Sequence, residues 1–598
     1  DIEMELLDVK RREILQDMGR RGVHVAPEHL EETTERRRSE KSGTVQPRLV
    51  DSLVLTVAEL SAGPVLLGPE TAVYLPDTGL SDALFFRLLE KTKIVFGGSV
   101  SLFEQVDGKD CIGGGMGVEC RKETLFSWPV IKNRILFREN VARIPENSIC
   151  LWGMKKLVLM GYAINILPKL RLEDNVMDGL WLDALFGEYV SEILDPKDSI
   201  WLGRVKRLKL ERYAVNLLPK LKLHEDNVME ELWLDACFAR HVSKIPAVGD
   251  SVCVGRAKSL KLKKYAIKIL PLLWLHGDNV MEELRLGAKK EEYVYSILRA
   301  EDRTIWLGKV KSLRLERYAV NILPKLKLHE DNVMEELQLD AWEGGDISET
   351  LGAKDNSIWL GRVKSLMLEW HTINLLPLLW LHEDSVLEEL RLGADRGEYV
   401  SEILRADDNS IWLGKVKSMR LEQHAANILP KLKLHADNVM DSLEIIGVSR
   451  DMLQKDSWIL NKIKTARSAL EILFPLKTGD PETEPLLGPW MNGDGASGTT
   501  PADGGCFGWK IKQIKMKDST LYALRGIRSD KSCVLDRFEY THRREEDTNR
   551  IFKSDERFYL GKIKQSGLII PPRIEKFLIY TLVDEEGNEV LEENNLIR

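Results

Sequence analysis

The chain has 598 residues, of which 30% are charged, and its formal net charge at pH 7 is only -8. Because this balance leaves no basic excess to neutralise a phosphate backbone, we expect no nucleic-acid partner. No apolar run reaches the roughly 18 residues that a transmembrane helix needs, so we also expect no membrane span.

The N-terminal part of the chain is polar and irregular. Residues 1–48 include a charge run at 31–41, and we expect a helix around Leu6–Met18 with partial disorder in the rest. Residues 49–130 are interpreted as an N-terminal cap with a degenerate repeat, because Val50–Leu55 already has the pattern of a repeat strand.

Residues 131–446 contain six copies of one sequence, and the clearest copy begins at Thr304. A glycine shared by five copies recurs every 52 or 53 residues, at Gly203, Gly255, Gly308, Gly361 and Gly414. A unit this short cannot bury its own apolar face and must stack on its neighbours. The period therefore predicts a solenoid.

Each copy contains two Leu-x-Leu pairs, one in a short half and one in a longer half. Alternation with period 2 is typical of a strand with one buried face. The pairs predict about twelve short parallel strands over 155–446, with Leu313 and Leu315 buried. In the longer half, Glu398–Leu404 has helical spacing, and we expect a short helix on the convex side. The recurring Trp201, Trp306, Trp359 and Trp412 are expected to fill the core there.

Residues 447–598 are interpreted as degenerate repeats and a C-terminal cap. Asp456–Lys464 and Asp555–Lys564 resemble part of the repeat, and the strand spacing recurs at Ile511/Ile514/Met516, Leu535/Phe538/Tyr540 and Ile574/Phe577/Ile579. The Gly-, Asp- and Ser-rich residues 491–505 predict a flexible loop.

Charges alternate in sign at the second strand position from Lys155 to Asp441. Opposite charges on neighbouring strands stabilise the pairing and like charges disfavour it. We therefore expect an ordered row of exposed, adjacent pairs such as Lys311 and Glu335, and a nearly neutral face.

The recurring histidines do not have the pattern of a metal site. Equivalent positions in successive copies are two strands, about 10 Å, apart, whereas the ligands of one zinc ion lie about 2 Å from it. We expect these histidines at a solvent edge, with no metal and no other cofactor. No catalytic constellation is recognisable, so no catalytic residue is predicted.

The fifth strand position is the best candidate for partner binding, because it varies between copies. Large aromatic and Arg side chains at exposed positions are enriched in interface hot spots. The candidate protein-binding residues are Trp181, Trp233, Arg285 and Arg391.

The spacing LxxLxLxx(N)xLxxLP in the copy at Thr304 resembles that of leucine-rich repeat proteins. The sequence NILPKLKLHEDNVMEEL at 321–337 is similar to that of lineage-specific leucine-rich arrays of microsporidian parasites. The resemblance implies an α/β solenoid with a parallel concave sheet, which commonly binds proteins, and with degenerate repeats and caps at both ends. Tyr162, Tyr213, Tyr265 and Tyr318 replace the family's usual asparagine or cysteine and are expected to stack in its place.

These patterns favour a non-enzymatic scaffold for protein–protein interaction, with a protein partner that the sequence does not identify. Two alternatives stay open: a secreted or surface structural protein of a parasite, and an adaptor that recruits an enzyme through its terminal regions. Seven cysteines without a CxxC pair, and a start without a signal-peptide pattern, favour the cytoplasm.

Overall fold

The protein is a stack of short parallel strands, as the Leu-x-Leu pattern predicts. The computed structural model describes residues 48–54, 65–75, 78–96, 100–103, 111–113, 125–128, 134–150, 154–194, 199–245, 252–354, 357–382, 384–448, 452, 509–519, 521–526, 533–542 and 557–590. The predicted helix at Leu6–Met18, the repeat-like segment 456–464 and the loop 491–505 lie outside these residues.

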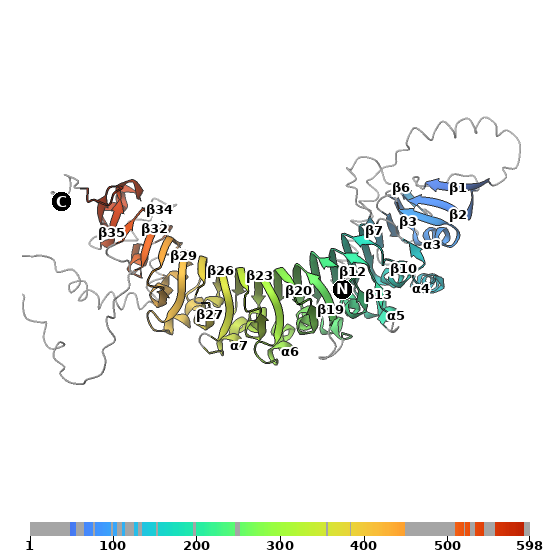
Figure 1. Ribbon diagram of the computed structural model, residues 1–598, viewed down its shortest axis with the longest axis horizontal. Coiled ribbons are helices and arrows are strands. Elements are labelled where there is room, and N and C mark those ends of the chain that lie inside the picture. The colour runs from blue at the N-terminus through green and yellow to red at the C-terminus, as the bar shows by residue number, and fades with distance from the viewer. Residues whose placement is uncertain are drawn as a thin grey trace, which may run out of the picture. The chain divides into compact units, whose positions relative to one another are not determined.

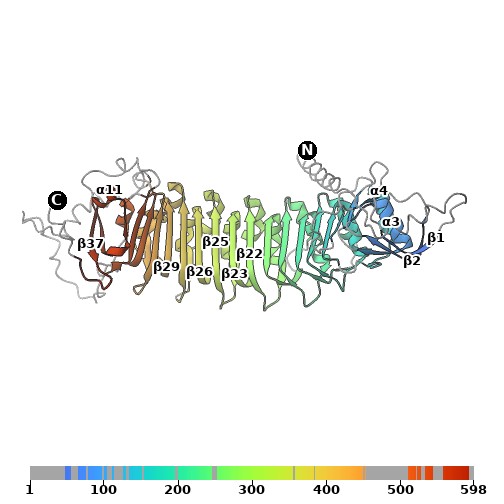
Figure 2. The same cartoon turned by 90° about the horizontal axis from the view of Figure 1, so that it is seen from above.

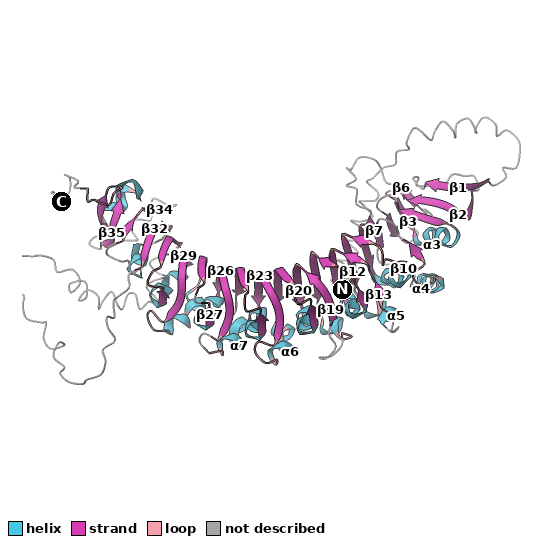
Figure 3. Ribbon diagram, viewed as in Figure 1, coloured by secondary structure: helices cyan, strands magenta, loops and turns pink. Residues whose placement is uncertain are grey.

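The chain divides into two units, residues 1–310 with 325–329 and residues 311–324 with 330–598. In each unit the main strands pair in parallel with their stacking neighbours, and the helices lie on one side of the sheet (Figures 1 and 3). We call the other side, over which no described helix lies, the open face. Figure 2 shows the main strands of each unit lying side by side.

All twelve predicted strands are present, and the fold class is confirmed. Those of the first unit are β9 (Lys156–Met160), β12 (Gly179–Ala184), β15 (Arg207–Arg212), β18 (Glu231–Ala236), β20 (Ser259–Lys264) and β22 (Val280–Ala288). Those of the second unit are β23 (Ile305–Arg317, from Lys311 on), β25 (Val333–Ala341), β26 (Ile358–Trp370), β28 (Val386–Ala394), β29 (Ile411–Gln423) and β31 (Val439–Ile446).

The Leu-x-Leu pairs form the core because each leucine points away from the open face. Leu313 and Leu315 are buried, as are the paired leucines of the neighbouring strands. Burying a leucine side chain contributes about 1.5–3 kcal/mol, so stacking each copy on the next stabilises the sheet.

Helical segments follow both halves of each copy. The short halves continue into 3-10 helices that end at or near a proline: η2 (Gly161–Lys169), η4 (Tyr213–Lys220), η6 (Tyr265–Leu272), η8 (Tyr318–Lys325), η10 (His371–Leu378) and η13 (His424–Lys431). The longer halves carry the predicted helices as short pieces: η3 (Gly187–Tyr189), α5 (Ser191–Leu194), η5 (Ala239–Val242), η7 (Glu291–Tyr293), α6 (Tyr295–Leu298), η9 (Gly344–Ile347), α7 (Ser348–Leu351), η11 (Gly397–Val400) and η12 (Ile403–Arg405).

Short parallel strand pairs lie on the helix side of the sheet, and we call them the back pairs. Three of them are β8 (Ile149–Cys150) with β10 (Leu170–Arg171), β13 (Ile200–Trp201) with β16 (Leu221–Lys222), and β19 (Val252–Ala257) with β21 (Leu273–Leu275). In the other three, the start of β23 pairs with β24 (Leu326–Leu328), the start of β26 with β27 (Leu379–Leu381), and the start of β29 with β30 (Leu432–Leu434). Two further short pairings join β11 (Val176–Met177) to β14 (Arg204–Val205) and β17 (Val228–Met229) to β19.

The back pairs correct the prediction that the recurring tryptophans fill the core. Within β23, Ile305 and Leu307 are buried and Trp306 between them points outward. Trp201, Trp306 and Trp412 are 43–51% exposed, and Trp359 is half-buried. The isoleucine and leucine on either side of each tryptophan take the inward positions, because side chains alternate along a strand.

The N-terminal elements add a second small sheet. They are β1 (Arg48–Val54), β2 (Val65–Leu75), β3 (Thr78–Ser81), α3 (Asp82–Lys91), β4 (Lys93–Phe96), β5 (Val100–Phe103), β6 (Cys111–Gly113), β7 (Leu125–Trp128) and α4 (Arg134–Arg143). Strands β1, β2 and β4 form a separate parallel sheet, whereas β7 pairs with β5 and β9. The strand predicted near Val50 therefore exists but lies outside the main sheet.

The C-terminal elements extend the array and then leave it. They are β32 (Lys510–Lys517), η14 (Leu521–Gly526), β33 (Val534–Leu535), β34 (Arg537–Thr541), β35 (Phe558–Lys564), η16 (Gln565–Gly567), β36 (Leu568–Ile569), α11 (Pro572–Glu575) and β37 (Leu578–Val583). Strand β31 pairs with β32 and β32 with β34, so the first two of the three predicted spacings form strands of the main sheet. The third predicted strand is wrong: Ile574 lies in α11, and Ile579 is exposed on β37, which pairs with β35.

Candidate functional site on the open face

The fifth strand position forms a continuous cross-strand row on the open face of the first unit. The sheet register places these residues opposite one another in the order Val158, Trp181, Lys209, Trp233, Lys261 and Arg285. Trp181 and Trp233 therefore lie two strands apart on the same face, as predicted, with Lys209 between them.

Lys209 joins the two indoles into one cluster. Its Nζ lies 4.0 Å from the centre of the Trp181 ring and 4.7 Å from that of Trp233. A second ammonium, that of Lys263, lies 4.8 Å from the centre of the Trp233 ring. Cation–π contacts of this kind contribute about 0.5–1 kcal/mol each at exposed sites. Both indoles are consequently half-buried, not fully exposed as the sequence suggested.

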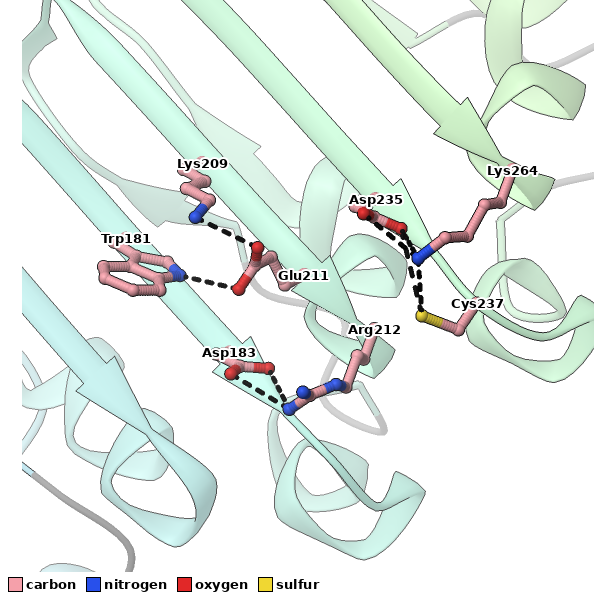
Figure 4. Close-up of polar contacts among 8 residues, drawn as sticks. All are labelled: Trp181, Asp183, Lys209, Glu211, Arg212, Asp235, Cys237 and Lys264. Atoms are coloured by element: carbon pink, nitrogen blue, oxygen red, sulfur yellow. Dashed lines mark hydrogen bonds and ion pairs between the residues drawn. The ribbon is translucent and has the colours of Figure 1, made fainter. Parts of the chain in front are cut away.

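Glu211 fixes one side of this cluster. Its carboxylate accepts a hydrogen bond from Nε1 of Trp181 at 3.2 Å and forms an ion pair with Lys209 at 3.0 Å (Figure 4). The Trp181 ring is thus held by a cation on its face and an anion at its edge. Such a ring is oriented before any partner arrives, which lowers the entropy lost on binding.

Two further ion pairs mark the C-terminal ends of these strands. Arg212 donates to both carboxylate oxygens of Asp183 at 3.0 and 3.1 Å, and Lys264 lies 3.0 Å from Asp235 and 3.1 Å from Sγ of Cys237 (Figure 4). Arg212 and Lys264 both have φ of +57°. Their ψ values are −128° and −130°, and holding a residue other than glycine in such a sparsely populated region costs about 1–3 kcal/mol.

Lys261 continues the row beyond Trp233. It forms ion pairs with Glu231 at 2.9 Å and Glu283 at 3.2 Å. The hydrogen bond that Lys261 donates to Glu231 raises the pKa of Lys261 above its usual value. Arg285, on β22, is the next residue in the row and is half-buried.

Arg391 belongs to the second unit and has different surroundings. It lies on β28 and forms an ion pair with Glu422 at 3.1 Å. Arg420 contacts the same carboxylate at 2.8 Å and also Glu444 at 3.2 Å. The structure therefore groups Trp181 and Trp233 in one cluster, and it places Arg391 in a separate Arg–Glu network.

Sequence reasoning missed Lys209 and Glu211 as members of the cluster. Trp181 belongs to the longer half of one copy and Lys209 to the short half of the next. Only the sheet register makes them neighbours. The signal was nevertheless present, because consecutive strands belong to alternate halves of the repeat.

The predicted row of alternating charges at the second strand position is confirmed at the places where neighbouring strands form ion pairs. Lys206 forms an ion pair with Asp178 at 2.7 Å, and their hydrogen bond lowers the pKa of Asp178 and raises that of Lys206. Lys311 and Glu335 are exposed and directly precede the register pair Ser312–Glu336. The alternation continues beyond the predicted array, where Lys512 on β32 lies 2.7 Å from Asp441.

The recurring histidines lie at the solvent edge and cap turns. Nδ1 of His224 accepts a hydrogen bond from the backbone N–H of Asp226 at 3.2 Å, and the same contact recurs at His276, His382 and His435. The next residue of the turn, Asn227, bonds both the N–H and the carbonyl of Val205. No described group of three His, Cys, Asp or Glu side chains is arranged to hold a metal ion.

The tyrosines at the family's asparagine position do not stack on one another. Tyr162 packs against Tyr189 and Tyr265 against Tyr293, with ring centres 4.5 and 4.7 Å apart. Tyr213 packs in the same way against His241, at 4.5 Å. In these three copies the ring of the short half thus meets a ring from the longer half that follows.

Comparisons with protein-family models, with characterised proteins and with solved structures found no match to this chain. Within the described ranges, no helix combines the length and the apolar character that crossing a bilayer requires.

Proposed function

We propose that the chain is a non-enzymatic scaffold of the leucine-rich repeat type, and that the open face of its first unit binds a partner protein. The observation that carries the proposal is the cluster of Trp181, Lys209 and Trp233. It places two half-exposed indoles two strands apart, on either side of Lys209, on a face over which no described helix lies.

Two features of the cluster support binding over a purely structural role. The core beneath it is complete without the indoles, because the flanking Leu180 and Leu182 fill the inward positions of β12. The indoles are also held in place by Lys209 and Glu211, and pre-oriented aromatic rings contribute large contact areas at low entropic cost.

The test begins with affinity capture from native extract, using the full chain as bait and mass spectrometry to identify the partner. Calorimetry then compares the wild type with Trp181→Ala and Trp233→Ala. We expect each change to weaken binding by roughly 1–4 kcal/mol, the range of interface hot spots, with nearly unchanged thermal stability.

Lys206→Ala is the matched control, since it removes an exposed side chain from a neighbouring strand of the same face. It should weaken binding much less, because Lys206 is already paired with Asp178. Full affinity in both tryptophan variants would exclude the open face as the binding surface.

A further inference from the structure

We propose that the outward side chains of the back pairs form a self-association surface, at which a second copy of this chain docks. We call these side chains the back row. In the first unit they are Trp201, Lys222, Cys253, Trp274, Trp306 and Lys327, and in the second unit they are Trp359, Trp380, Trp412 and Lys433.

The back row exposes much more aromatic surface than the fold requires. Trp274 and Trp380 are 53% and 49% exposed, and Trp201, Trp306 and Trp412 are similarly exposed. From the size of an indole, the three tryptophans of the first unit expose roughly 300 Å² together. Monomeric proteins rarely expose contiguous apolar patches larger than a few hundred Å², and a patch of about this size is often functional.

The residues around the indoles carry both signs of charge. Lys327 Nζ lies 5.7 Å from the centre of the Trp306 ring, and Lys433 Nζ lies 5.7 Å from that of Trp412. Next to the back pairs lie exposed turn aspartates, Asp226 and Asp278 in the first unit and Asp384 and Asp437 in the second, with 73–88% of each side chain exposed. A surface with parallel rows of cations and anions is complementary to itself when a two-fold axis relates two copies.

The spacing of the row identifies the occupant as another repeat. Equivalent residues of successive copies lie two strands, about 10 Å, apart. In the first unit each of three successive back pairs carries one indole, Trp201, Trp274 and Trp306, and Trp274 lies on the second strand of its pair. A partner that contacts one indole in each back pair must share the period of the array. A second copy of this chain has that period and also supplies the complementary charges.

The proposal is independent of the one for the open face, because the two surfaces lie on opposite sides of the sheet. The chemistry also differs. On the open face Trp181 contacts Lys209 and Glu211, and Trp233 contacts Lys209 and Lys263, all in the first unit; the back row has indoles in both units.

Sedimentation equilibrium of the full chain tests the proposal with the double variant Trp380→Lys/Trp412→Lys. The wild type should rise in mass with concentration to at least twice that of one chain, and the double variant should raise the dissociation constant at least tenfold. Trp342→Lys is the matched control. It changes a tryptophan of the same unit that is 56% exposed and lies outside the back row, and it should leave the dissociation constant unchanged.

A second measurement needs no variant. Cys253 is exposed within the back row of the first unit, so its alkylation rate, followed by peptide mass spectrometry, should fall as the copies associate. A wild type that stays monomeric at every concentration overturns the proposal. So does a result in which Trp181→Ala raises the dissociation constant of association as much as the double variant does. Unchanged alkylation of Cys253 across the association range also counts against it.

Discussion

His241 makes the first unit sensitive to acid, and His241→Tyr should remove that sensitivity. The imidazole is buried, lies against Tyr213 and Phe238, and occupies the position that Tyr189 and Tyr293 fill in other copies. Tyrosine is therefore a side chain that this position already accommodates elsewhere in the array.

The magnitude follows from the pKa of this histidine. Burial, assisted by the positive charges of Arg240, Arg212 and Lys264, lowers the pKa of His241 from 6.5 to about 4. The unfolded chain therefore binds a proton below pH 6.5 that the folded chain binds only near pH 4. Stability falls as the pH drops through this window, by roughly 3 kcal/mol in total at about 1.4 kcal/mol per pH unit.

Urea unfolding at several pH values between about 7 and 4 measures this loss. Wild type should lose roughly 3 kcal/mol more than His241→Tyr over the window. His241→Phe should behave like the tyrosine variant, since neither side chain titrates there. Equal acid dependence in all three proteins would show that His241 does not remain neutral in the fold.

Two further substitutions test the packing of the array. Gly203→Ala should destabilise more than Gly414→Ala in thermal unfolding. Both positions have φ near +70°, which costs about 1–2 kcal/mol for alanine. The difference is steric: at Gly203 the new Cβ would lie 2.4 Å from the carbonyl oxygen of Leu172, whereas at Gly414 the nearest atom is 3.7 Å away. Leu313→Ala should lower the free energy of unfolding by roughly 2–5 kcal/mol, because the leucine is buried in the core; a smaller loss in urea titration would contradict that placement.

The sequence predicted the main sheet well because two independent signals agreed there. Leu-x-Leu alternation placed Leu313 and Leu315 in the core, and the charge alternation fixed which strands are neighbours. The same alternation was available at Ile305–Leu307, where it places Trp306 outside. The expectation failed there because large apolar residues are usually buried, and an outward apolar side chain looks like a core residue in a hydrophobicity pattern.

Only part of the candidate site could be predicted from the sequence, because its contacts depend on how neighbouring strands are aligned. The positions of Trp181 and Trp233 follow from the repeat. The role of Lys209 depends on side-chain directions across three neighbouring strands, and its contact with Trp181 joins two successive copies. The hydrogen bond to Glu211 is similarly invisible in the sequence, because it joins residues 30 positions apart.

The hydrogen bonds of the turns have a consequence for how the length of this array can change during evolution. Asn227 bonds Val205, and the N–H of His224 bonds the carbonyl of Gly203, so these contacts close within one copy. The contacts with the preceding copy include the ion pair of Lys206 with Asp178. Gain or loss of a whole 53-residue block in the gene therefore keeps every lysine opposite an acid. Loss of half a block would set lysine against lysine, so unequal recombination is expected to change the gene in whole copies.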